Sequence, residues 1–100
     1  MIQEAKIVDN QMQVILTGSI YVEDARKIKE TLSSCIDNGQ TSFLINLSQV
    51  EYIDGAGLGA LVYLQKQALK KGGRVVIKGI NGLVKDIFEL TRLTKVFEIQ

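Results

Sequence analysis

The chain has 100 residues, enough for one domain with a single apolar core but too few for two lobes enclosing a cleft, so multi-domain enzymes are excluded. Its composition, 46% apolar and 23% charged, is typical of a soluble globular protein, and no apolar run approaches the roughly 20 residues that span a bilayer. The formal net charge is +1 with acids and bases interspersed, which argues against nucleic acid as a partner.

The first half of the chain predicts a hairpin, a helix and a buried strand. Residues 12–18 place Met12, Val14 and Leu16 on one face, as in a strand with a buried side, and residues 4–8 form a weaker strand before them. Asn38-Gly39 can end the helix that follows, and residues 42–47 are apolar except for Asn46, which is typical of a central strand. The apolar positions of this helix recur at spacings of three and four: Val22, Ala25, Ile28, Leu32, Cys35 and Ile36.

The second half predicts two more helices and two more strands. A helix follows a cluster of glycines and ends at Gly72-Gly73, and residues 74–79 are typical of a strand. Asn81 is placed to cap a third helix, and residues 95–99 supply a last short strand. The apolar positions are Leu58, Leu61, Val62, Ala68 and Leu69 in the second helix and Leu83, Val84, Ile87, Phe88 and Leu90 in the third.

This order, ββαβαβαβ, predicts a single α/β domain over residues 1–100. Successive strands joined by helices should run parallel with right-handed crossovers, giving one mostly parallel sheet of about five strands. Because three helices cannot cover both faces evenly, we expect them chiefly on one face, with the other face half open.

The stretch "YIDGAGLGALV", residues 52–62, places three glycines in five positions at the start of the second helix. Asp54 is expected to be the N-cap of that helix, accepting a hydrogen bond from a first-turn N–H group. Glycine in a helix costs about 1 kcal/mol relative to alanine, so a cap alone does not explain Gly55, Gly57 and Gly59 together. A flat surface that a partner approaches closely would explain them.

A phosphate cradle is the alternative, because Gly55, Gly57 and Ala60 satisfy the relaxed dinucleotide pattern G-x-G-x-x-A. Eight positions separate the predicted strand end, Leu47, from Gly55, whereas that pattern needs a tight turn directly after the strand. The next strand ends at Lys78 rather than at an acid. A nucleotide-binding protein is therefore the disfavoured interpretation.

Residues 44–62, with residues 16–20 upstream and 72–99 downstream, resemble the STAS domain of bacterial anti-sigma factor antagonists over nearly the full chain. Such proteins usually carry Asp-Ser-Ser-Gly-Leu-Gly. That pattern aligns its aspartate with Asp54 and its Gly-Leu-Gly with Gly57, Leu58 and Gly59. The family serine falls on Gly55 or Ala56.

The resemblance implies a partner with a serine-kinase fold, an anti-sigma factor, which phosphorylates a serine in this turn and is thereby released. Neither Gly55 nor Ala56 has a hydroxyl group to accept the phosphate, whose charge would be about −2. A second departure is Tyr21, which stands where many relatives have an aspartate near the switch. Either this chemistry has been abandoned, or Ala56 is an engineered replacement of a serine.

Other candidates each have a structural alternative. Tyr21, Val22 and Tyr52 are a docking patch around the turn or ordinary packing at a strand end. Ser48 is a substitute phosphate acceptor or, as we favour, a turn hydroxyl after a central strand. Four basic residues form either a patch that attracts an acidic partner or, as we favour, a solvated helix face. They are Lys66, Lys70, Lys71 and Arg74.

The sequence thus predicts a cytoplasmic, non-enzymatic binding module without cofactor, metal or membrane insertion. Cys35 is the single cysteine and histidine is absent, which excludes a Cys/His zinc cluster and an imidazole base, and we expect Cys35 to pack. The partner is an anti-sigma factor with a serine-kinase fold or another STAS-binding protein, as in a lipid-transport or stress-signalling complex. The expected partner-binding residues are Tyr21, Asp54, Gly55, Ala56, Gly57, Leu58 and Gly59.

Overall fold

The computed structural model describes all residues, 1–100, and contains one five-stranded sheet with strand order β1-β2-β3-β4-β5. Strand β1 is antiparallel to β2, and the other neighbours are parallel, so the α/β fold expected from the element order is confirmed. The elements are β1 (Ile2–Val8), β2 (Gln11–Ile20), α1 (Val22–Asp37), β3 (Ser42–Ile53), α2 (Gly55–Lys70), β4 (Arg74–Lys78), α3 (Gly82–Leu90), the 3-10 turn η1 (Leu93–Lys95) and β5 (Glu98–Ile99).

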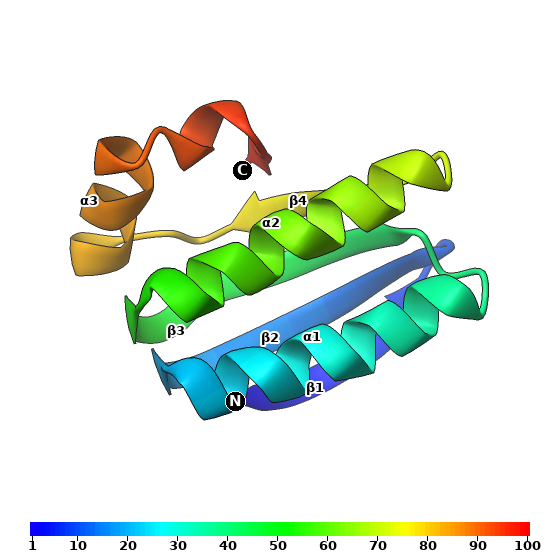
Figure 1. The fold of residues 1–100 in the computed structure, drawn as a ribbon, viewed down its shortest axis with the longest axis horizontal. Coiled ribbons are helices and arrows are strands. Elements are labelled where there is room, and N and C mark those ends of the chain that lie inside the picture. The colour runs from blue at the N-terminus through cyan, green and yellow to red at the C-terminus, as the bar shows by residue number, and fades with distance from the viewer.

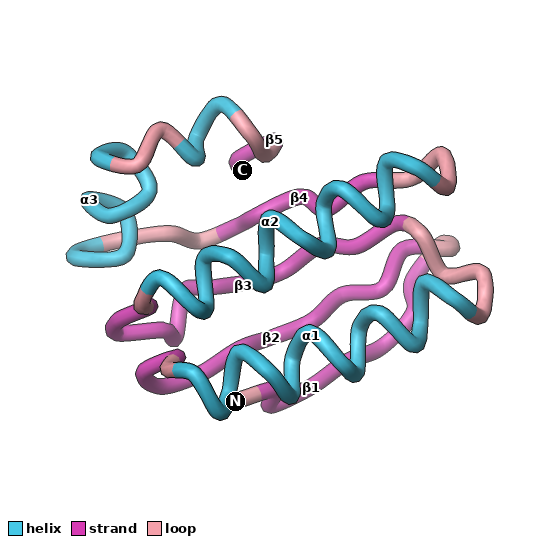
Figure 2. The backbone as a smooth tube through the Cα atoms, viewed as in Figure 1, coloured by secondary structure: helices cyan, strands magenta, loops and turns pink.

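Helices α1 and α2 lie side by side on one face of the sheet and run in the same direction (Figures 1 and 2). Helix α3 lies at one end of the molecule, and its Val84 and Phe88 belong to the same core as α1, α2 and the sheet. The expectation of helices chiefly on one face is therefore confirmed. None of the helices combines the length and apolarity needed to span a bilayer.

The two faces of the sheet differ as the alternation of side chains requires. On β3, Phe43, Ile45 and Leu47 point to the helices and are buried, at 1% exposure or less. Between them lie Leu44 and Asn46, which line a groove of about 140 Å³ on the other side. The helix-free face is thus half open, as expected.

The β1–β2 hairpin is closed by a two-residue turn. Asp9 and Asn10 both have positive φ, 51° and 66°, between the paired residues Val8 and Gln11. Two central residues in the left-handed region are the mark of a type I′ turn, whose twist matches that of the flanking strands. The predicted hairpin is therefore present, and its first strand is longer than expected.

Strand β3 is also longer than predicted, because it continues past Leu47 to Ile53. Its pairing with β4 stops at Asn46, but its pairing with β2 resumes after a bulge and runs to Ile53. Two inferences from the sequence are therefore wrong. Ser48 is a strand residue rather than a turn residue, and the distance from strand end to Gly55 does not argue against a nucleotide site.

The start of α3 differs from prediction in its contacts. Asn81 is the N-cap residue by position, yet its side chain makes no capping bond. Its amide instead donates to the carbonyl oxygens of Ser48 at 3.3 Å and Gly79 at 3.0 Å, which ties the loop before α3 to β3.

Four apolar positions that the sequence assigned to the buried faces of helices are exposed in the structure. They are Val22, Leu69, Leu83 and Leu90.

Candidate functional site

Asp54 is the single residue that connects β3 to α2. Its backbone is extended, its N–H group donates to the carbonyl oxygen of Ile20 at 3.1 Å, and its side-chain Oδ1 accepts from the N–H group of Gly57 at 2.9 Å. The first bond joins the end of β2 to the start of α2, and the second is an N-cap. The predicted cap is confirmed.

The three glycines of the turn have different environments. A Cβ atom on Gly57 would lie 2.5 Å from Cγ1 of Ile53 and 3.0 Å from Cγ2 of Ile20, so close packing inside the fold favours glycine there. A Cβ atom on Gly55 or Gly59 would meet no atom within 4 Å apart from its chain neighbours and the backbone of its own helix. The fold therefore accounts for Gly57 but leaves the other two glycines unexplained.

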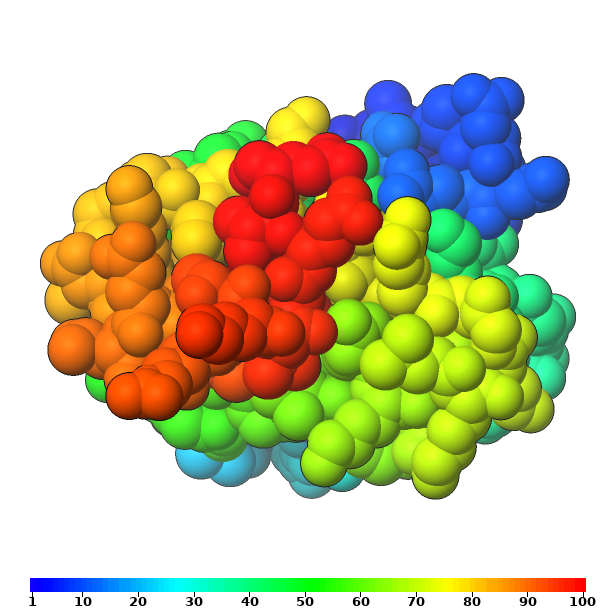
Figure 3. Space-filling model, turned by 90° about the horizontal axis from the view of Figure 1, so that it is seen from above, coloured from blue at the N-terminus to red at the C-terminus, as the bar shows by residue number.

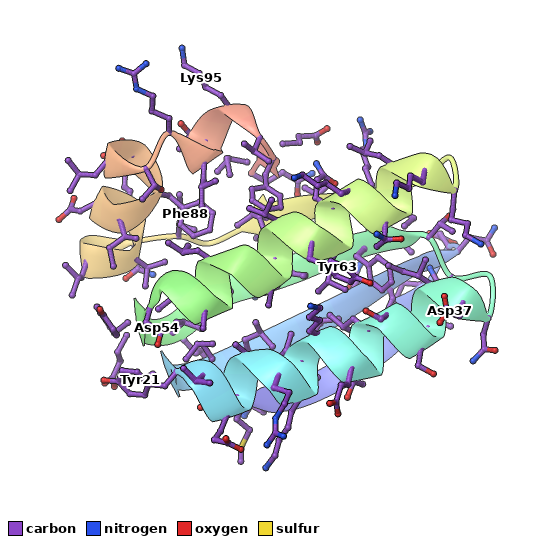
Figure 4. The ribbon with its side chains drawn as sticks, in the orientation of Figure 1. Tyr21, Asp37, Asp54, Tyr63, Phe88 and Lys95 are labelled. Atoms are coloured by element: carbon purple, nitrogen blue, oxygen red, sulfur yellow. The ribbon has the colours of Figure 1, made fainter.

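Tyr21 lies beside this turn, because β2 and β3 are parallel neighbours and their C-terminal ends lie together (Figure 4). Its ring packs against that of Tyr52, with centroids 5.7 Å apart and planes at 43°. Tyr21 is nevertheless 53% exposed and its neighbour Val22 is 61% exposed. The structure brings both residues to the turn and leaves them accessible, whereas Tyr52 is partly covered.

A groove of about 300 Å³ runs between the first halves of α1 and α2. Its α2 side is made of small residues, Ala56, Gly59 and Ala60, and Val22 and Ala25 of α1 continue the apolar lining. The absence of side-chain bulk at position 59 thus opens this groove, which begins at the candidate turn.

The α1 rim of the groove carries two cations, Arg26 and Lys29. Arg26 pairs with Glu23, and Nζ of Lys29 lies 4.2 Å from the ring centroid of Tyr63, which projects from α2 between the two helices (Figure 4). The sequence interpretation missed both cations. The signal was their spacing from Val22, four and seven positions, which puts all three on one helix face.

The arrangement suits a protein surface better than a phosphate. An anion at the start of α2 would meet the carboxylate of Asp54, which already accepts a first-turn hydrogen bond and carries the negative charge that the helix dipole favours. The cations nearest the turn already have partners, Arg26 with Glu23 and Lys29 with the ring of Tyr63. The exposed lysines at positions 66, 70 and 71 lie in the second half of α2 and at its C-cap, away from the turn. The candidate site is therefore the surface formed by residues 54–59 and Tyr21, with the adjoining groove.

Known proteins resemble this chain over nearly its whole length. A family model of the STAS domain matches residues 3–100. The anti-sigma-B factor antagonist of Bacillus subtilis is 30% identical over 91 residues, which cover 91% of this chain and 83% of that protein. A crystal structure of a candidate anti-sigma factor antagonist from Thermotoga maritima is 27% identical with a TM-score of 0.91, covering 96% of this chain and 83% of that chain.

The unphosphorylated anti-sigma factor antagonist SpoIIAA also has this fold, with a TM-score of 0.80 at 16% identity over 100% of this chain and 87% of that chain. The chain therefore belongs to the STAS domain family and is similar to its anti-sigma factor antagonists.

Proposed function

We propose that this protein is a non-enzymatic regulatory module that docks an anti-sigma factor with a serine-kinase fold through residues 54–59 and Tyr21. The observation that carries the proposal is the open space around Gly55 and Gly59. The fold does not use their lack of a side chain, although glycine inside a helix, as at position 59, lowers helix stability by about 1 kcal/mol relative to alanine. A partner backbone in close contact with the turn accounts for both.

The surroundings of the glycines support docking. Tyr21 and Val22 offer exposed apolar area beside the turn, and aromatic anchors are favoured at the centres of interfaces. The adjoining groove can take a side chain of the partner between α1 and α2. Oδ2 of Asp54 has no hydrogen-bond partner within the chain and remains available to a donor from the partner.

The regulation we propose differs from that implied by the family. Gly55 and Ala56 occupy the positions where the family pattern has its serine, and both are exposed at the start of α2. Without a hydroxyl group there is no acceptor for the γ-phosphate in this turn. Release of the partner would then depend on binding equilibrium and not on phosphorylation.

An Ala56→Glu variant tests the docking surface. Ala56 is exposed in the first turn of α2, where the helix dipole favours a carboxylate by about 0.3 to 1 kcal/mol, so the stability should hardly change. Against an apposed partner, the same carboxylate adds bulk and must lose water. We expect binding to the cognate anti-sigma factor to weaken by about 2 to 5 kcal/mol, measured by calorimetry.

Lys66→Glu is the matched control, because it also adds negative charge on α2 but lies away from the turn. It should affect binding much less. If Ala56→Glu and the unaltered protein melt alike and bind the partner equally well, residues 54–59 are only a helix cap and the proposed docking surface is wrong.

Incubation with the partner kinase and ATP tests the proposed regulation. Intact-mass spectrometry should find no phosphate on the unaltered chain, whereas Ala56→Ser should restore an acceptor that can be placed in line with the γ-phosphate. Phosphate on the unaltered protein, mapped to Ser48 or any other hydroxyl, would contradict the loss of the switch.

A further inference from the structure

We propose that the free edge of β1 pairs with β1 of a second copy of this chain, antiparallel, about a two-fold axis at Ala5. The two sheets would join into one continuous sheet. The contact is isologous, because each copy presents the same strand to the other. It is independent of the proposed function, since β2 separates β1 from β3 and from the docking turn.

The two edges of the sheet are unequal. Strand β5 has two residues, whereas β1 has seven, of which all but Ile2 are exposed. The turn end of the hairpin, in blue, projects from one corner of the molecule (Figure 3). A long exposed edge strand presents unpaired N–H and C=O groups and is a template for another strand, so β1 is the edge open to pairing.

The hairpin register determines which backbone groups face outward. The type I′ turn closes on Val8 and Gln11, which is therefore a hydrogen-bonded pair, and the register is regular from Val8 back to Glu4. Alternation then gives Lys6 and Glu4 the next ladder bonds to β2. The N–H and C=O groups of Ala5 and Ile7 consequently point to the free edge, where another strand can bond to them.

The charges select the axis at Ala5. When Ala5 of one chain faces Ala5 of the second copy, Glu4 of each chain lies directly opposite Lys6 of the other. Both side chains line the helix-free face, so these pairs meet on the same side of the joined sheet. An axis at Ile7, the other outward-facing residue, would set Lys6 against Val8 and Glu4 against Asn10. An axis at a non-hydrogen-bonded pair would oppose two lysines, if at Lys6, or two glutamates, if at Glu4. Only the axis at Ala5 therefore places opposite charges across the strand pair.

Glu4 and Lys6 have no competing ion pair in the monomer, whose three salt bridges involve other residues. A lone edge lysine usually discourages strand pairing. Here the glutamate two positions earlier would turn that lysine into a cross-strand partner, and directly opposed unlike charges stabilise a strand pair. The register shift between Ile2 and Glu4 limits the paired stretch, so the association should be weak and reversible.

Charge-swap variants studied by sedimentation equilibrium test the proposal, in low-salt buffer and up to about 1 mM protein so that weak association is populated. The unaltered protein should form a reversible dimer. Glu4→Lys alone and Lys6→Glu alone each place two like-charged pairs across the axis, and each should weaken dimerisation by about tenfold. The double variant Glu4→Lys/Lys6→Glu restores opposite charges and should return the dissociation constant to the unaltered value.

Two controls separate local pairing from overall charge. Lys71→Glu and Glu89→Lys change the net charge by the same amounts at exposed positions on other elements, and they should leave dimerisation unchanged. A chain that stays monomeric throughout the concentration range, a dimer indifferent to the single swaps, or a double variant that remains weakened would each overturn the proposal.

Discussion

The inner and outer faces of the first two turns of α2 use the same small residues for opposite reasons. On the inner face, Gly57 and Leu61 are buried, and Gly57 lies so close to Ile53 and Ile20 that any added side chain would force them to shift. On the outer face, a methyl group added to Gly55 or Gly59 would have no atom within 4 Å, and both residues border open solvent or the groove. Packing limits which residues the inner face can carry, whereas it places no such limit on the outer face.

This difference separates stability from function within a single helix. A substitution on the inner face changes the free energy of unfolding first, and any loss of binding follows from the damaged fold. A substitution on the outer face can add the helix propensity that glycine lacks and still obstruct a partner. The two faces should therefore respond to mutation with opposite signs in stability.

Leu61→Ala should produce the largest effect, because Leu61 is 1% exposed in the core between α2 and the sheet. Removing a buried leucine side chain leaves a cavity and typically costs about 2 to 5 kcal/mol. Urea melts measure this as a lower midpoint at unchanged slope. A loss no greater than that of an outer-face variant would show that this helix face is not part of a tightly packed core.

Gly57→Ala should have an intermediate effect of the same sign. The new methyl group would press against Cγ1 of Ile53, which is itself buried and cannot move far. Overpacking of a core costs about 1 to 3 kcal/mol, and better helix propensity returns at most about 1 kcal/mol, so we expect a net loss of about 1 to 2 kcal/mol. Thermal and urea melts that match the unaltered protein would contradict the close packing around Gly57.

The order of elements and the helix-facing side of the sheet could be predicted because hydrophobic periodicity is local. The length of β3 could not. Its second half, after Leu47, pairs with β2 across a bulge, and the buried positions change phase there, from Ile45 and Leu47 to Val50. Asn81 likewise has a cap-forming side chain by type, but tertiary contacts with Ser48 take its amide instead.

The candidate site shows the same limit. Asp54 could be identified as a cap because its partner, Gly57, is three positions away and the bond depends only on local geometry. The groove could not be identified, since its walls come from two helices that are separated in sequence by the whole of β3. Nor does the sequence distinguish a glycine required by packing, such as Gly57, from one in open space, such as Gly59.

Gly59→Ala is the smallest change in stability and the sharpest test of the comparison. The added methyl group meets no atom within 4 Å and the position lies inside α2, so the protein should become more stable, by up to about 1 kcal/mol. The same methyl group narrows the groove between α1 and α2, where Gly59 is part of the lining. We therefore expect weaker binding of the anti-sigma factor together with a higher urea midpoint, a combination that damage to the fold cannot produce. Calorimetric affinity and melts on the same samples measure both quantities. An unchanged affinity with raised stability would mean that the open glycine serves no partner, and that the outer face of α2 differs from the inner one only in being exposed.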